Sequence, residues 1–92
     1  MRLGTFITDT NPNGAGFDEI VEHARWAEAA GLASGWVPYV PWSFDAMVTL
    51  ALVARETTTL ELGTAVVPTY PFHPQAMARS ALSVNAVAQG RL

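Results

Sequence analysis

The sequence predicts an α/β fold made of the first three βα units of a (β/α)₈ barrel. Strand-like and helix-like segments alternate three times along the 92 residues, and such alternation implies parallel strands joined by right-handed crossovers. The strand-like segments begin near residues 3, 34 and 60. Eight units of this spacing make about 250 residues, the usual length of a (β/α)₈ (TIM) barrel.

The first unit is a short strand over 3–8 and a helix over 17–30, separated by the turn-rich stretch "DTNPNGAG". The apolar side chains of the helix fall on one face, at Ile20, Ala24 and Ala27. Acidic residues crowd its first turns, which favours a helix N-terminus. Gly31 is expected to end this helix, because glycine is common at the C′ position.

The second unit is a strand over 34–37 and a helix over 44–56, which Ser43 or Asp45 can cap. This helix is apolar on nearly all sides. A helix of that kind is buried on more than one side.

The third unit is a strand over 60–67 and a helix over 74–89. Pro74 suits the first helical position, where its missing N–H costs nothing, and Gly90 is expected to close the helix. The residues expected to face inward are Met77, Ser80, Ala81, Val84 and Ala88. Arg91 and Leu92 would then start a fourth strand.

The main rival is a doubly wound Rossmann-like sheet, which normally carries a glycine-rich phosphate turn after its first strand. The stretch "TDTNPNGAG" holds no such motif, which favours the barrel. Three units cannot close a barrel, and their edge strands would keep unpaired backbone groups. We therefore expect residues 1–92 to be a truncated, partial barrel domain at the N-terminus of a longer protein, or a piece that must assemble.

Composition excludes several classes of function. The formal net charge is −3 and there is no lysine, so a nucleic acid is not an expected partner. Cysteine is absent, and His23 and His73 do not have metal-ligand spacing, so no metal site is predicted. No stretch reads as a signal peptide or a membrane span, so we expect a soluble, cytoplasmic protein with no membrane partner.

Two segments carry a family resemblance. "HARWAEAAGLASGWVP", and "ELGTAVVPTYPFHP" followed by a helix and "GRL", resemble the luciferase-like flavin-dependent superfamily. They are most similar to its oxidoreductases that use the deazaflavin coenzyme F420. The resemblance covers nearly the whole chain. It implies a (β/α)₈ barrel with the cofactor at the carboxyl ends of the strands, and a homodimer formed through the helices 44–56 and 74–89.

The resemblance also implies a cofactor site at the end of the third strand. In this family that strand ends in a bulge, often with a non-prolyl cis peptide, which supports one face of the flavin-like ring. The bulge falls on Ala65 and Val66 here. The expected cofactor-binding residues are Thr64, Ala65, Val66, Pro68 and Thr69.

Aromatic residues in and beside the second and third strand-to-helix loops are expected to wall this site, because stiff rings exclude water and fix a planar ligand. They are Trp36, Tyr39, Trp42, Tyr70 and Phe72. The expected substrate-binding residues are Asp9, Trp36, Tyr39 and Tyr70. The alternatives are that the aromatic residues only cover the barrel end and that Asp9 only forms a turn.

The implied reaction is hydride transfer between the deazaflavin and a small organic substrate. Many F420-dependent relatives have an acidic residue and then a proton-donating histidine after the second strand, but this sequence has Tyr39 and Val40 there. The weak candidates for catalysis are Tyr39, although a phenol is a poor acid at neutral pH, and His73, for which a role in starting the helix is favoured. The alternatives are a monooxygenase dependent on flavin mononucleotide (FMN) and, if 92 residues are the whole product, a non-catalytic fragment or assembly module.

Overall fold

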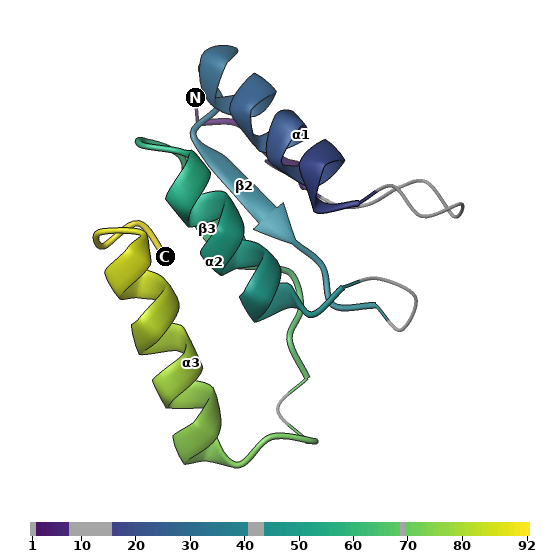
Figure 1. Cartoon of the computed structure of the whole chain (residues 1–92), viewed down its shortest axis with the longest axis vertical. Helices are drawn as coiled ribbons and strands as arrows, with labels where there is room; N and C mark the ends of the chain where they lie inside the picture. Colours follow the sequence, from purple (N-terminus) through teal and green to yellow (C-terminus); the bar gives the residue numbers. More distant parts are fainter. Residues whose placement is uncertain (1, 8–15, 41–43, 69) are drawn as a thin grey trace.

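The computed structural model describes residues 2–7, 16–40, 44–68 and 70–92. Its strands and helices alternate as β1 (Gly4–Phe6), α1 (Phe17–Ala29), β2 (Ser34–Val37), α2 (Ala46–Glu56), β3 (Glu61–Thr64) and α3 (Pro74–Val87). The strands form one parallel sheet in the order β1-β2-β3 (Figure 1). This confirms the predicted alternation and parallel pairing.

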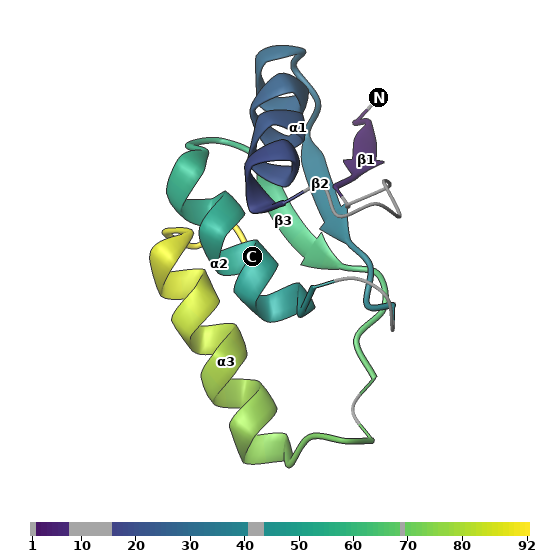
Figure 2. The same cartoon turned by 45° about the vertical axis from the view of Figure 1, so that its right-hand side comes forward.

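All three helices cover one face of the sheet, and α2 lies between α1 and α3 (Figures 1 and 2). The opposite face, which we call the inner face, is covered by none of the described helices. The core lies between the helices and the sheet, and its largest fully buried apolar side chains are Ile7, Ile20, Leu50, Val53 and Leu60. The central place of α2 explains why its sequence is apolar on nearly all sides.

The helix ends follow their capping chemistry. Asp45 caps α2, because its Oδ2 accepts a hydrogen bond from the Val48 N–H at 3.0 Å; the helix therefore begins at residue 46 rather than 44. The alternative cap, Ser43, lies outside the described residues. α1 ends in a Schellman motif, in which Gly31 has φ +83° and the Leu32 N–H bonds to the Ala27 carbonyl at 3.0 Å.

α3 ends two residues earlier than expected. Val87 is its last helical residue, and Gln89 takes the left-handed C′ position with φ +54°. Gly90 follows with φ +88° and donates its N–H to the Asn85 carbonyl at 3.0 Å. The helix is thus closed by two consecutive left-handed residues rather than by the glycine alone.

The strand expected over 60–67 is shorter, and spans only Glu61–Thr64. The neighbouring strand β2 ends at Val37, so β3 has no paired strand residue beside it beyond Thr64. The last bond between the two segments joins the Ala65 N–H to the Val37 carbonyl at 3.1 Å. β1 is likewise shorter than the expected 3–8, although residue 8 lies outside the described part.

The chain returns beside β3 after α3. The Leu62 N–H donates to the Arg91 carbonyl at 2.8 Å, on the side of β3 away from β2. This bond is what the start of a fourth parallel strand requires, and it agrees with the expected role of Arg91 and Leu92.

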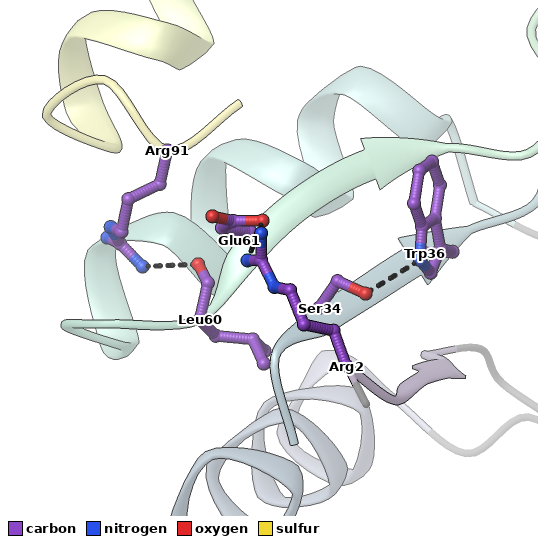
Figure 3. Close-up of polar contacts among 6 residues, drawn as sticks. All are labelled: Arg2, Ser34, Trp36, Leu60, Glu61 and Arg91. Atoms are coloured by element: carbon purple, nitrogen blue, oxygen red, sulfur yellow. Dashed lines mark hydrogen bonds and ion pairs between the residues drawn. The ribbon is translucent and has the colours of Figure 1, made fainter. Parts of the chain in front are cut away.

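The amino ends of the strands are held by the side chain of Arg91 (Figure 3). Its Nη1 donates to the Leu60 carbonyl and the Thr57 hydroxyl, each at 3.0 Å. Its Nη2 donates to the carbonyls of Ala54 at 2.8 Å and Thr57 at 3.1 Å, and its Nε donates to the Ala88 carbonyl at 2.7 Å. One guanidinium therefore joins the ends of α2 and α3 to the start of β3.

Glu28 of α1 holds the same turn from the other side. Its carboxylate accepts backbone N–H bonds from Thr58, Thr59 and Leu60 at 2.9, 2.8 and 3.0 Å. Burial alone would raise the pKa of Glu28, but the N–H donors of Thr59, Leu60 and Thr58 outweigh it and lower the pKa from 4.5 to about 2. We call Glu28, Arg91 and the turn 57–60 the amino-end clasp.

Candidate functional site

The carboxyl ends of β2 and β3 lie side by side. Val37 is in register with Thr64, and the Ala65 N–H bonds to the Val37 carbonyl. The segments that follow, 38–40 and 65–68, therefore leave the sheet at the same edge. In α/β folds with parallel strands this edge is where ligands bind.

The segment 64–68, which we call the ledge, follows the expectation for the end of the third strand. The peptide bond between Ala65 and Val66 is cis, at the position that the resemblance implied. Val66 is 75% exposed, whereas Thr64, Ala65 and Pro68 are half-buried. The ledge thus presents a small apolar surface next to β2. The remaining expected cofactor residue, Thr69, lies outside the described residues.

The expected aromatic wall is only partly assembled. The Tyr39 ring meets Phe72 edge-on with 6.3 Å between ring centroids, so the loops after β2 and β3 are in contact. A cavity of about 70 Å³ lies beneath them, lined by Tyr39, Asp45, Met47, Val67, Phe72, Ala76, Met77 and Ser80. Tyr70 is 99% exposed and therefore does not pack against this group. Asp9 and Trp42 lie outside the described residues.

Trp36 is the penultimate residue of β2 and lies on the inner face of the sheet. Its Nε1–H donates to Ser34 Oγ at 3.0 Å, on the same face of β2 (Figure 3). Its ring passes over Gly63 of β3. Trp36 is still 42% exposed, because all the described helices lie on the other face of the sheet.

His73 is the N-cap of α3. Its Nδ1 accepts a hydrogen bond from the Gln75 N–H at 3.1 Å, and Pro74 occupies the first helical position. The structure thus supports the favoured helix-starting role. The imidazole is exposed, at the end of the loop that joins the ledge to α3.

Two further findings concern only the described part of the chain. No group of three His, Cys, Asp or Glu side chains gathers there in a way that could hold a metal ion. Among the described helices, none combines the length and the apolar character needed to cross a membrane.

A protein-family model described as "Luciferase-like monooxygenase" matches residues 1–92. This chain belongs to the luciferase-like monooxygenase family. Among solved structures it is similar to the monooxygenase RslO1 from Streptomyces bottropensis, with a TM-score of 0.80 and 23% identity. That match covers 100% of this chain and 31% of the other, so the chain spans about a third of that protein's length. Comparison with curated protein sequences found no significant match.

The solved neighbour supports the fold that the sequence predicted. The three βα units correspond to the N-terminal part of a luciferase-like (β/α)₈ barrel. In this barrel the inner face of the sheet becomes the barrel interior and the ledge lies at its mouth.

The sequence interpretation missed three residues that shape the inner face. Phe6 is in register with Trp36 and is 58% exposed there, while Ser34 and Gly63 set the position of the indole. Phe6 was recoverable from strand alternation, because it lies two residues after Gly4 on the same face. The role of Gly63 depends on a side chain 27 residues earlier, which no local pattern reveals.

Proposed function

We propose that this chain forms the first three βα units of an oxidoreductase that transfers hydride between coenzyme F420 and a small organic substrate. The observation that carries the proposal is the exposed apolar ledge at the carboxyl edge of β3, in a chain of this family. The "ELGTAVVPTYPFHP" segment, which contains the ledge, is also part of the most specific stretch of the family resemblance.

The ledge suits the face of a planar ring. Ala65 is small enough for a ring to approach the backbone, Val66 offers an apolar wall, and no residue of 64–68 is charged. A deazaflavin supplies the hydride chemistry when bound, and the protein supplies position and a dry pocket. Thr64, Pro68 and Thr69 would complete the contacts to the ring edge.

Substrate contacts are proposed for Asp9, Trp36, Tyr39 and Tyr70. Of the two weak catalytic candidates, Tyr39 is half-buried at the mouth and its hydroxyl can donate a hydrogen bond to a substrate oxygen. His73 is occupied as a helix cap through Nδ1. We also propose a homodimer through α2 and α3, on whose outer sides Val48 and Leu82 are exposed.

A second candidate is an FMN-dependent monooxygenase. The matching family model and the solved neighbour both carry the word monooxygenase in their descriptions, which favours this reading. The ledge would support an isoalloxazine ring as well as a deazaflavin ring, because both are flat and present an apolar face.

Calorimetric titration of the complete protein with coenzyme F420 and with FMN tests the proposal. We expect F420 to bind at least tenfold more tightly, and the reduced cofactor to be reoxidised only when a substrate is added. Tighter binding of FMN, with oxygen consumption, would replace the first candidate with the second. Binding of neither cofactor by folded protein would favour a non-catalytic assembly module.

A further inference from the structure

We propose that Trp36 forms the floor of the substrate pocket and limits how deep an apolar substrate group can enter. The inference rests on the proposed function, because it assigns a role within that site. It adds a determinant of substrate size and names the chemistry of the group that reaches the floor.

The register of the sheet places Trp36 directly below the ledge. Phe6, Trp36 and Gly63 form one row across the three strands. Alternate residues of a strand share a face, so the next inner positions towards the mouth are Pro38 and Ala65. A spacing of two residues is about 7 Å. Trp36 is therefore the first large side chain that a ligand resting on the ledge meets below it.

The position of the indole is fixed from three sides. Its Nε1–H bonds to Ser34 Oγ at 3.0 Å. A Cβ atom at Gly63 would lie 2.5 Å from Cζ3 and 2.7 Å from Cε3 of Trp36, and a Cβ at Gly4 would lie 3.0 Å from Nε1. The ring thus extends across the sheet over two positions that have no side chain. The indole therefore forms a flat floor. It can lie this way only because Gly4 and Gly63 have no side chains.

The surroundings determine what can rest on this floor. Trp36 and Phe6 keep 42% and 58% of their surfaces exposed on the inner face. The nearest ion pair, Arg2 with Glu61 at 2.6 Å, lies one row further from the mouth, level with Ser34 (Figure 3). The row that holds Trp36 therefore offers only apolar contacts. It fits an alkyl or aromatic end of the substrate, not a charged or strongly polar one.

A series of 4-alkylphenols, from phenol to 4-hexylphenol, tests the floor in the complete, cofactor-loaded protein. Binding is followed by calorimetry and by the change in the visible spectrum of the cofactor. In the wild type, affinity should rise about fourfold for each added CH₂ group until the tail meets Trp36, and then stop rising. In Trp36→Ala this break should shift to alkyl chains about two carbons longer. Relative to phenol, the longest phenols should then gain roughly tenfold or more in affinity over the wild type.

Trp26→Phe is the matched control, because Trp26 lies exposed on α1, away from the inner face. It should leave the break unchanged. Trp36→Phe should move the break by a smaller amount, and it carries the test if Trp36→Ala does not fold, as judged by circular dichroism. A purely structural role would weaken all phenols equally and leave the break in place.

An unmoved break in folded, cofactor-binding Trp36 variants would overturn the floor, as would failure of the wild type to bind any phenol. Both outcomes leave the proposed function intact, because cofactor binding is measured separately. If the wild type bound neither F420 nor FMN, the proposed function would fall, and the floor with it.

Discussion

The two ends of this sheet differ in chemistry: the amino end is held by charged groups, and the carboxyl end is mostly apolar. At the amino end, Glu28 and Arg91 direct charged groups at the turn 57–60, and together they join α1, α2, α3 and β3. At the carboxyl end, the ledge and the loops that follow β2 and β3 hold mostly apolar and aromatic groups, and several of these are exposed. One end is a network of satisfied hydrogen bonds, and the other is an apolar surface that the described part of the chain leaves partly exposed.

The difference separates stability from function. Charge-assisted bonds to backbone groups restrict movement, so they suit the end of a parallel fold that holds the scaffold together. An exposed apolar surface lowers stability in water unless something covers it, and such surfaces mark ligand sites. Changes at the amino end should therefore alter folding, and changes at the carboxyl end should alter binding.

Arg91→Ala should have the largest effect on stability. It removes five donated hydrogen bonds and leaves the carbonyls of Ala54, Thr57 and Leu60 without this donor. We expect a loss of about 2–4 kcal/mol in the free energy of unfolding of the complete protein, measured by urea denaturation. Arg79→Ala, at an exposed position on α3, is the control and should change stability by less than about 0.5 kcal/mol.

A loss in Arg91→Ala no larger than that in Arg79→Ala would show that the clasp does not hold the amino end together. Arg91→Lys should recover only part of the loss, since an ammonium cannot reach five separated acceptors as the planar guanidinium does.

Val66→Asp should have the largest effect on binding. A carboxylate on the ledge would lie against the face of the ring and lose hydration when the cofactor binds. We expect at least a roughly 100-fold loss of cofactor affinity by calorimetry with little change in the unfolding curve, because Val66 is 75% exposed. Val66→Thr keeps the shape and should retain most of the affinity. Normal affinity in a folded Val66→Asp protein would remove the ledge from the cofactor site.

Glu28→Gln should have a smaller effect that depends on pH. The pKa of Glu28 is lowered to about 2 in the folded chain, so its contribution is complete above pH 4.5 and is lost as the pH falls towards 2. Because Glu28 is partly exposed, solvent screening reduces this contribution to roughly 1–2 kcal/mol at pH 7. The wild type and Glu28→Gln should differ by this amount at pH 7 and converge near pH 2 in urea denaturation. A difference that stays constant over that range would rule out the carboxylate as its cause.

The sequence predicted the parts of the fold that depend on nearby residues. The end of α1 and the starts of α2 and α3 follow from Gly31, Asp45 and Pro74, each acting within a few residues. β3 was predicted too long because its end depends on where the neighbouring strand β2 ends, at Val37. The clasp was not foreseen, since Glu28 and its backbone donors lie 30 to 32 residues apart.

The candidate site divides in the same way. The position of the ledge followed from strand chemistry and from the family resemblance. Trp36 was expected in or beside the loop after the second strand, and it is the penultimate residue of β2. The positioning of its ring by Gly4 and Gly63 on other strands was not foreseen. Contacts between strands require the register, which the sequence does not supply.

The smallest expected effect concerns His73, which caps the start of α3 and is also a weak candidate for catalysis. Its Nδ1 accepts the Gln75 N–H, so His73→Ala should cost about 1 kcal/mol or less in the free energy of unfolding. His73→Asn is the informative partner, because asparagine is a strong N-cap without an imidazole. If His73 only starts the helix, His73→Asn should restore both stability and kcat. If the imidazole also serves as the catalytic acid, His73→Asn should restore stability and leave kcat low. The two measurements separate a scaffold role from a chemical one at a residue where the structure shows only the first.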